Sequence, residues 1–354
     1  MSKNIVVCLD GTGNQLKATG NTNVVRLYEM LELGDPTRQI AYYDPGVGTF
    51  SAAGAWTAPG RKVSRLSGLA FGSGLKTNLA EAYTYLMRHY EPGDRLYLFG
   101  FSRGAYTARA LAGLIQAVGL LRPGSENLVP YAIGIYAKNR DFTKDDWDQL
   151  HRFAGTFSVP VGGRFGVPVE YLGLWDSVKA AGLLRWNLRW LHTRQLPNAR
   201  RARHAVSLDE RRRPYEEYLI ERPRTPRPPP ALVEQVWFAG VHSDVGGTFD
   251  DDPQLPTIAL KWVVDGALDA GLLLKDAAYE TALAVDAGHA LGTVHRMGHV
   301  WALLTYRSRS APPGASVHYS VRHRVAHDPR YGRRLPKDVV WANTDWLDPH
   351  PGVR

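Results

Sequence analysis

The stretch Leu96-Tyr-Leu-Phe-Gly-Phe-Ser-Arg-Gly104 decides the fold, because it joins two different patterns. Its first four residues form a short apolar run typical of a buried strand. The residues after it, Ala105-Tyr-Thr-Ala-Arg-Ala-Leu-Ala112, favour a helix. Between them, Gly100-Phe-Ser-Arg-Gly104 fits G-x-S-x-G, in which a strand turns sharply into a helix and leaves a serine hydroxyl at the sheet edge. The pattern predicts Ser102 as a nucleophile. The alternative is a tight turn with an idle serine.

Other short apolar runs also end in Gly, Asp, Ser or His: Ile5–Leu9, Ile40–Tyr43, Val169–Leu174 and Val236–Ala239. Helical patterns cover Thr22–Leu33, Leu75–His89, Ala105–Ala117 and Pro256–Ala270. Runs of this kind suit buried parallel strands. Polar residues at their carboxyl ends suit an α/β sheet, where sites form at that edge. We therefore predict an α/β fold, with a mostly parallel central sheet and helices on both faces.

The composition is that of a globular protein, with 354 residues, 44% apolar and 22% charged. Lys and Arg number 43 against 34 Asp and Glu, a net charge of +9. The single Cys8 excludes an internal disulfide framework and a cysteine metal cluster. No apolar run is long enough for a signal-peptide core or a membrane span. We expect a protein made in the cytosol, with signal-independent export and peripheral membrane contact left open.

We predict a single domain over residues 1–354, with an insertion at 183–230, a peripheral tail at 311–354 and a loop at Thr49–Lys76. The insertion is strongly basic and ends in a proline-rich segment. Trp186 and Trp190 are four residues apart and would share one face of a helix. With Trp56 they are candidates for contact with substrate or an anionic membrane. The alternative is a helix packed on the core. Nucleic acid is disfavoured, because no recognised binding module is present.

A serine nucleophile needs a base, and the base needs a carboxylate that orients it. In α/β-hydrolases these follow the serine in the order acid, then histidine. Asp176 and His242 both come directly after predicted strands and fit that order. A second set keeps Ser102 but uses Asp244 and His318. The sequence favours the first set and leaves the second open. The other histidines weighed, His204, His289, His295 and His299, are expected to be structural or at the surface.

Acyl transfer also needs hydrogen-bond donors for the oxyanion. One is expected to be the backbone N–H of Arg103, directly after the nucleophile. The loop Asp10-Gly-Thr-Gly-Asn14 is the candidate for the second, through Gly11 or Thr12. Asp10 could also join Asp44 and Asp244 around a hard cation. Capping of helices and turns is the favoured role for these carboxylates, so we predict neither a metal nor a cofactor.

Five motifs occur together and in order: Leu9–Asn14, Gly100–Tyr106, Leu172–Val178, His204–Arg211 and Gly240–Gly247. With them the chain resembles the α/β-hydrolase domain family of type VI secretion phospholipase effectors, which also includes many bacterial and fungal proteins. The resemblance implies an α/β-hydrolase-like fold. It also implies Ser102 as nucleophile, Asp176 as acid and His242 as base.

We therefore expect a serine hydrolase that cleaves carboxylic esters, of a lipid or phospholipid, through an acyl-enzyme. The alternative is a non-catalytic α/β-hydrolase-like domain that binds an anionic membrane or a protein partner through its basic face. The sequence does not indicate an oligomeric state.

Overall fold

The computed structural model describes residues 2–11, 16–46, 69–138, 140–179, 189–221, 232–296 and 307–353, with backbone only for 69–73 and 189. Within these residues the strands of the central sheet run in the order β12-β11-β10-β9-β7-β3-β1-β2. Their bounds are β1 Asn4–Leu9, β2 Gln39–Asp44, β3 Arg95–Phe101, β7 Val169–Trp175, β9 Ala199–Ser207, β10 Leu232–Phe238, β11 Ser316–His318 and β12 Val340–Ala342. Every neighbouring pair is parallel. The predicted α/β fold is confirmed as α/β-hydrolase-like.

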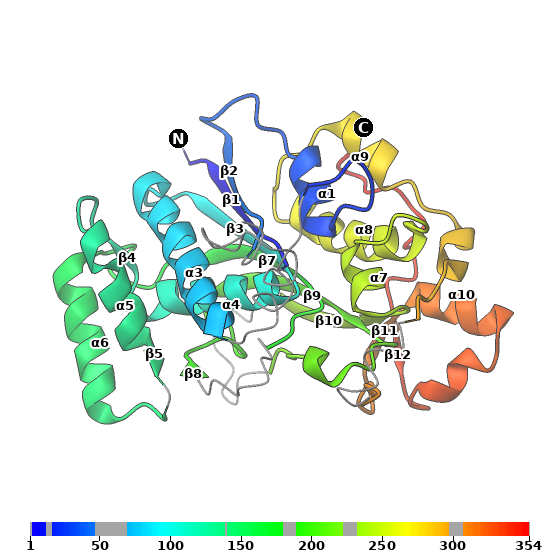
Figure 1. Ribbon diagram of the computed structural model, residues 1–354. Coiled ribbons are helices and arrows are strands. Elements are labelled where there is room, and N and C mark those ends of the chain that lie inside the picture. The colour runs from blue at the N-terminus through cyan, green and yellow to red at the C-terminus, as the bar shows by residue number, and fades with distance from the viewer. Residues whose placement is uncertain are drawn as a thin grey trace, which may run out of the picture.

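Helices cover both faces of this sheet (Figure 1). Side chains alternate along a strand, so β1 sends Ile5, Val7 and Leu9 to one face and Val6 and Cys8 to the other. The first face packs against α3 Leu69–His89, α4 Arg103–Ala117, α5 Val129–Tyr136 and α6 Lys144–Phe157. The second packs against α1 Asn23–Met30, α8 Gln254–Leu268, α9 Asp276–Ala282 and α10 Tyr319–His327. Apolar cores therefore cover both faces of the sheet, and its edges are left for polar residues.

The short elements lie around this frame. Two-stranded antiparallel pairs join β4 Leu120–Leu121 to β6 Ser158–Val159, and β5 Ala137–Lys138 to β8 Arg189–Trp190. The remaining pieces are α7 His242–Gly246 and the 3-10 turns Glu126–Leu128, Arg213–Tyr215, Ala287–Leu291 and Tyr331–Arg334. None of the helices in the described ranges is long and apolar enough to cross a membrane.

The segment predicted as an insertion at 183–230 instead supplies a strand to the middle of the sheet. β9 lies between β7 and β10. The sequence analysis did not predict this strand because its arginines do not form an apolar run. Long cationic side chains can nevertheless occupy a strand when they reach polar partners at the sheet edge. Arg200 pairs with Glu170 at 2.7 Å, and Arg203 with Glu234 at 2.8 Å. The single-domain assignment stays a prediction. The tail at 311–354 adds β11 and β12 to the sheet edge.

Candidate active site

Ser102 sits on a sharp turn between β3 and α4, in a strained backbone conformation with φ 59° and ψ −121°. The turn needs its two glycines. A Cβ on Gly100 would lie 2.6 Å from the backbone N of Ala105. A Cβ on Gly104 would lie 2.1 Å from the carbonyl oxygen of Leu9, at the end of β1. The first turn of α4 therefore packs directly on the neighbouring strand, which fixes the serine at the carboxyl edge of the sheet.

The structure brings Ser102, His242 and Asp176 together. His242 begins α7, just after β10, and its Nε2 lies 2.8 Å from Ser102 Oγ. Its Nδ1 lies 2.5 Å from Asp176 Oδ2, and Asp176 directly follows β7. An ionised carboxylate only accepts hydrogen bonds, so Nδ1 carries the imidazole proton and Nε2 is left to accept the serine hydroxyl. This arrangement can remove a proton from Ser102.

Asp176 is fully enclosed and has donors on both carboxylate oxygens. Its Oδ1 accepts from the backbone N–H of Ser207 at 2.9 Å and from Arg309 Nη1 at 2.6 Å. Burial favours the neutral acid, but Arg309 and His242 together hold the pKa of Asp176 well below its usual value. Just behind it, the backbone N–H of Ser177 donates to His204 Nε2 at 3.1 Å. The acid is therefore ionised and held in one orientation.

The imidazole of His242 is packed between two rings. Phe101 stacks on it with centroids 4.7 Å apart, and Tyr215 meets it edge to face at 4.8 Å. Glu210 Oε2 accepts the backbone N–H of His242 at 3.2 Å. Burial lowers the pKa of His242 below its usual value, although Asp176 and Glu210 act in the opposite direction. His242 is therefore neutral near pH 7, as a general base must be.

Of the predicted oxyanion donors, Arg103 directly follows Ser102 and is the first residue of α4, where the helix dipole favours negative charge. The N–H of Gly11 donates to Asp10 Oδ1 at 2.6 Å. Asp10 Oδ2 in turn accepts from Thr22 and Tyr43. Thr12 lies outside the described residues.

The alternative set with Asp244 and His318 is not brought together. Asp244 Oδ1 lies 2.6 Å from His295 Nδ1, and its Oδ2 accepts the N–H of Val241 at the start of α7. The ring nitrogens of His318 lie 2.8 Å from Ser320 Oγ and 3.1 Å from Asn343 Nδ2. Both residues therefore have structural partners of their own. Asp10, Asp44 and Asp244 likewise bind separate partners, and in the described ranges no three His, Cys, Asp or Glu side chains are grouped to hold a metal.

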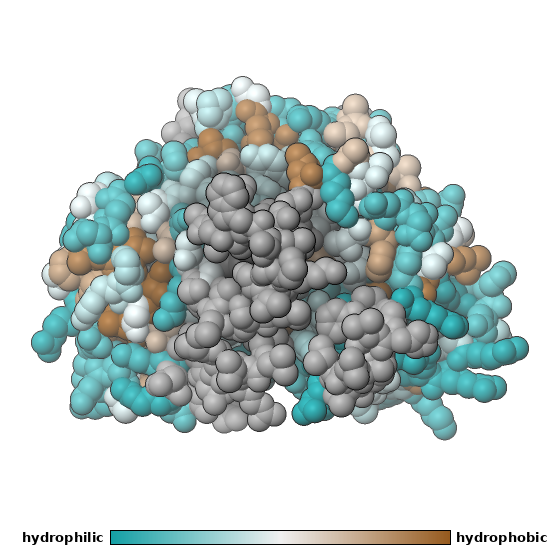
Figure 2. Space-filling view, viewed as in Figure 1, coloured by the Kyte–Doolittle hydropathy of each residue, from teal (hydrophilic) through white to brown (hydrophobic). Residues whose placement is uncertain are grey.

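The predicted tryptophan contacts are corrected at the one position that the structure describes. Trp190 is only 6% exposed and packs edge to face on Tyr136. It lies in β8 rather than on a helix, and its buried ring offers no surface to a membrane. Trp56 and Trp186 lie outside the described residues. On the visible face, described apolar residues form separate small groups among hydrophilic ones (Figure 2).

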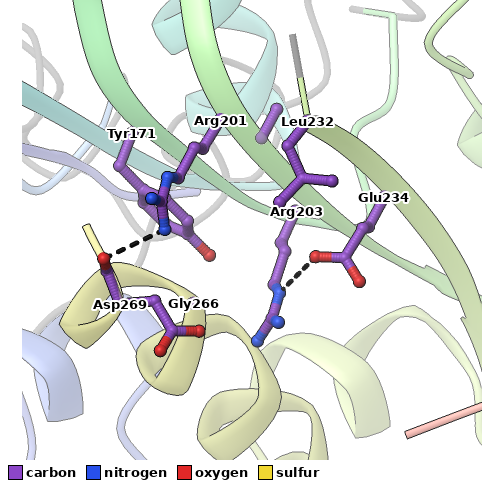
Figure 3. Close-up of a pocket in the computed structure, with 8 residues that line it drawn as sticks. Tyr171, Arg201, Arg203, Leu232, Glu234, Gly266 and Asp269 are labelled. Carbon is purple, nitrogen blue, oxygen red and sulfur yellow. Dashed lines mark hydrogen bonds and ion pairs between the residues drawn. The ribbon is translucent and has the colours of Figure 1, made fainter.

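A concave feature lies at the other end of the sheet. It is a notch beside the amino halves of β7, β9 and β10, lined in part by Arg201, Arg203 and Glu234 (Figure 3). Arg201 donates to the carbonyl of Asp269, and Arg203 pairs with Glu234. Arg201 is therefore held by a backbone carbonyl and Arg203 by a carboxylate of the protein. Parallel strands place it at the edge opposite Ser102, so it does not belong to the candidate site.

Sequence reasoning missed the residues that enclose Asp176 and His242. Glu210 and Tyr215 belong to the segment between β9 and β10, inside the range predicted as an insertion. Arg309 stands in a polar stretch with no motif around it. Glu210 lies inside the motif His204–Arg211, which was the only signal available. No sequence signal marked Arg309, because its partner Asp176 is 133 residues away in the sequence.

A family model matches residues 3–266 of the chain: type VI secretion system phospholipase effector Tle1-like, catalytic domain. The chain belongs to this family. The resemblance that the motifs carry is confirmed by this match. Residues 267–354 lie outside the matched range, so Arg309 is beyond it.

Individual relatives agree over part of their length. The uncharacterized protein YEL023C of Saccharomyces cerevisiae is 40% identical over 215 residues, which are 59% of this chain and 31% of that protein. The chain thus spans less than a third of this curated relative. An uncharacterized protein from Pseudomonas aeruginosa aligns over 82% of this chain and 50% of its own, at 21% identity and a TM-score of 0.47. The Tle1 effector, solved bound to the VgrG spike, aligns over 70% and 51%, at 18% identity and a TM-score of 0.38.

Proposed function

We propose that this protein is a serine hydrolase that cleaves carboxylic esters of lipids, with phospholipids as the leading substrate class. The observation that carries the proposal is the hydrogen-bonded chain from Ser102 Oγ through His242 to Asp176, at 2.8 and 2.5 Å. Membership in the phospholipase effector family supports the lipid substrate.

In the first half of the reaction, Ser102 Oγ attacks the acyl carbonyl carbon as its proton passes to His242 Nε2. Asp176 stabilises the imidazolium that forms. The backbone N–H of Arg103 donates to the oxyanion, helped by the amino end of α4. The tetrahedral intermediate then breaks the ester C–O bond. His242 gives its proton to the leaving oxygen, which departs as an alcohol and leaves an acyl group on Ser102.

In the second half, water replaces the alcohol. His242 Nε2 takes a proton from the water as its oxygen attacks the acyl carbonyl. Collapse of the second intermediate breaks the bond to Ser102 Oγ, and His242 returns the proton to that oxygen. The products are a free carboxylic acid and the restored serine. No step requires an oxidant, a metal or a cofactor.

A covalent probe tests this proposal most directly. We expect a fluorophosphonate to label the wild-type protein at Ser102, and the wild type to release fatty acid from phospholipid vesicles. Ser102→Ala should lose both. Ser125→Ala is the matched control, since this serine lies before the 3-10 turn Glu126–Leu128 and its backbone bonds to Arg122 and Leu128 rather than to any residue of the site. Folded wild type that takes no label and releases no acid would instead favour the non-catalytic binding domain.

A further inference from the structure

One hydrogen-bond donor to the carboxylate of Asp176, Arg309, comes from the C-terminal part of the chain. Arg309 Nη1 donates to Asp176 Oδ1 at 2.6 Å and to Ser207 Oγ at 2.8 Å. Both side chains of the pair are nearly inaccessible, at 3% and 1% exposed. A buried ion pair of this geometry is costly to leave half made. Loss of Arg309 would therefore leave the buried charge of Asp176 without this partner.

Arg309 also contacts the segment that follows β9. We name residues 207–217, from the last residue of β9 to Glu217, the strap. Nη2 of Arg309 donates to the carbonyl of Tyr215 at 2.5 Å, and its Nε lies 3.5 Å from Glu217 Oε2. Tyr215 is the residue whose ring meets His242 edge to face. One guanidinium thus connects the acid with the ring that packs on the base.

The position of Arg309 is fixed by its own backbone. The N–H of Arg307 donates to the carbonyl of Arg211 at 2.8 Å, and that of Arg309 reaches the carbonyl of Glu210 at 3.4 Å. Glu210 is itself anchored by a buried ion pair with Arg212, which stacks on the Tyr215 ring. Segment 307–309 therefore runs alongside the strap rather than loosely over it.

We propose that Arg309 is a positioning residue: by holding Oδ1 of Asp176 it turns Oδ2 toward His242 and keeps the acid, the base and the strap in register. This inference rests on the proposed function of the site. It assigns part of the active-site support to a residue beyond 3–266, the range that the family model covers. The planar guanidinium suits the role, because it can donate to a carboxylate and a carbonyl at once.

The charges that face His242 set the direction of the test. They are Asp176 at its Nδ1, Glu210 at its backbone N–H, and Arg309 behind Asp176, with the Tyr215 hydroxyphenyl ring against its edge. Arg309 lowers the pKa of His242, whereas Asp176 and Glu210 raise it. Removal of the Arg309 cation should therefore raise the pKa of His242.

The experiment compares Arg309→Met with Arg307→Met. Arg307 lies two residues away, is 71% exposed and pairs with Glu216 in solvent, so its loss should change little. We expect Arg309→Met to lower kcat/KM for ester hydrolysis at pH 7 about 10- to 100-fold. We also expect the acidic limb of its pH profile to move to higher pH. Arg309→Lys, which keeps the charge, should hold the limb near its wild-type position and serves if Arg309→Met does not fold.

Two readouts separate positioning from simple stabilisation. In the Asp176→Asn background, Arg309→Met should cost much less than in the wild type, because its route of action is already removed. NMR titration of the His242 Cε1–H, assigned by its loss in His242→Asn, should show the raised pKa without any turnover. Equal losses in both backgrounds, or an unmoved His242 titration, would overturn the inference. Failure of the wild type to take a fluorophosphonate would refute the proposed function instead, and the titration would still decide the role of Arg309.

Discussion

Ser102 Oγ and His242 Nε2 lie 2.8 Å apart although 140 residues separate them in the sequence. The sheet order explains the meeting. β3 precedes Ser102, β7 precedes Asp176 and β10 precedes His242, and all three end at the same edge because they are parallel. Helix α7 begins at His242. In the sheet order β9 and β7 lie between β10 and β3, and the His242 ring reaches Ser102 past their carboxyl ends. The parallel direction of the strands is therefore what first brings the three residues to one edge of the sheet.

The two candidate bases differ in what they touch, and the difference is measurable. We expect His242→Gln to lower kcat for ester hydrolysis by about 10⁴ or more, because Ser102 loses its proton acceptor. His318→Gln should keep kcat within a few-fold, since that ring is bound to Ser320 and Asn343. A steady-state assay of both variants checks this. An inactive, folded His318→Gln protein beside an active His242→Gln protein would contradict the assignment.

The pH dependence follows from the burial of His242. Only the neutral imidazole can accept the serine proton, and burial lowers the pKa of His242 below its usual value of about 6.5. Activity should therefore be full at pH 7 and fall as the pH drops through the lowered pKa, with half-maximal kcat/KM below pH 6.5. Hydrolysis measured from pH 4.5 to 9 tests this. A half-maximum above pH 7 would show that the base is not held neutral by burial.

The turn at Ser102 should tolerate no side chain at Gly104. Alanine normally favours a helix over glycine, but here its Cβ would lie 2.1 Å from the Leu9 carbonyl oxygen. We expect Gly104→Ala to reduce the free energy of unfolding by about 1–3 kcal/mol or more. Gly134→Ala is the matched control. It lies in α5, where an added Cβ would meet no other atom within 4 Å, and should gain about 0.5–1 kcal/mol.

Urea unfolding of both glycine variants gives the comparison. Ester hydrolysis should fall with Gly104→Ala and stay unchanged with Gly134→Ala. A Gly104→Ala protein as stable and active as the wild type would mean that α4 can move away from β1, against the close packing described above.

The local sequence pattern predicts a strand correctly where the strand is apolar and a polar site residue directly follows it. The runs Ile5–Leu9 and Val169–Leu174 predict strands, and they are β1 and β7. β9 was missed because its first half is cationic, and those side chains find acids and carbonyls supplied by other elements. Arg309 was missed for a related reason. Its partner Asp176 is 133 residues away, and nothing local marks an arginine that will be buried.

The buried His318 should make the fold sensitive to acid. Burial lowers its pKa to about 3 in the folded protein, well below the 6.5 or so of an unfolded chain. Between these values the unfolded chain binds a proton that the folded protein excludes, so the free energy of unfolding falls as the pH falls from about 6.5 toward 3. His318→Gln should lose stability at pH 7.5, where the ring packs on Phe238. Its free energy of unfolding should also fall less than that of the wild type between pH 7.5 and pH 4.5, because glutamine at position 318 binds no proton in the unfolded chain. Urea unfolding at pH 7.5, 6 and 4.5 measures both effects, and an equally steep decline in the variant would show that His318 does not carry this acid sensitivity.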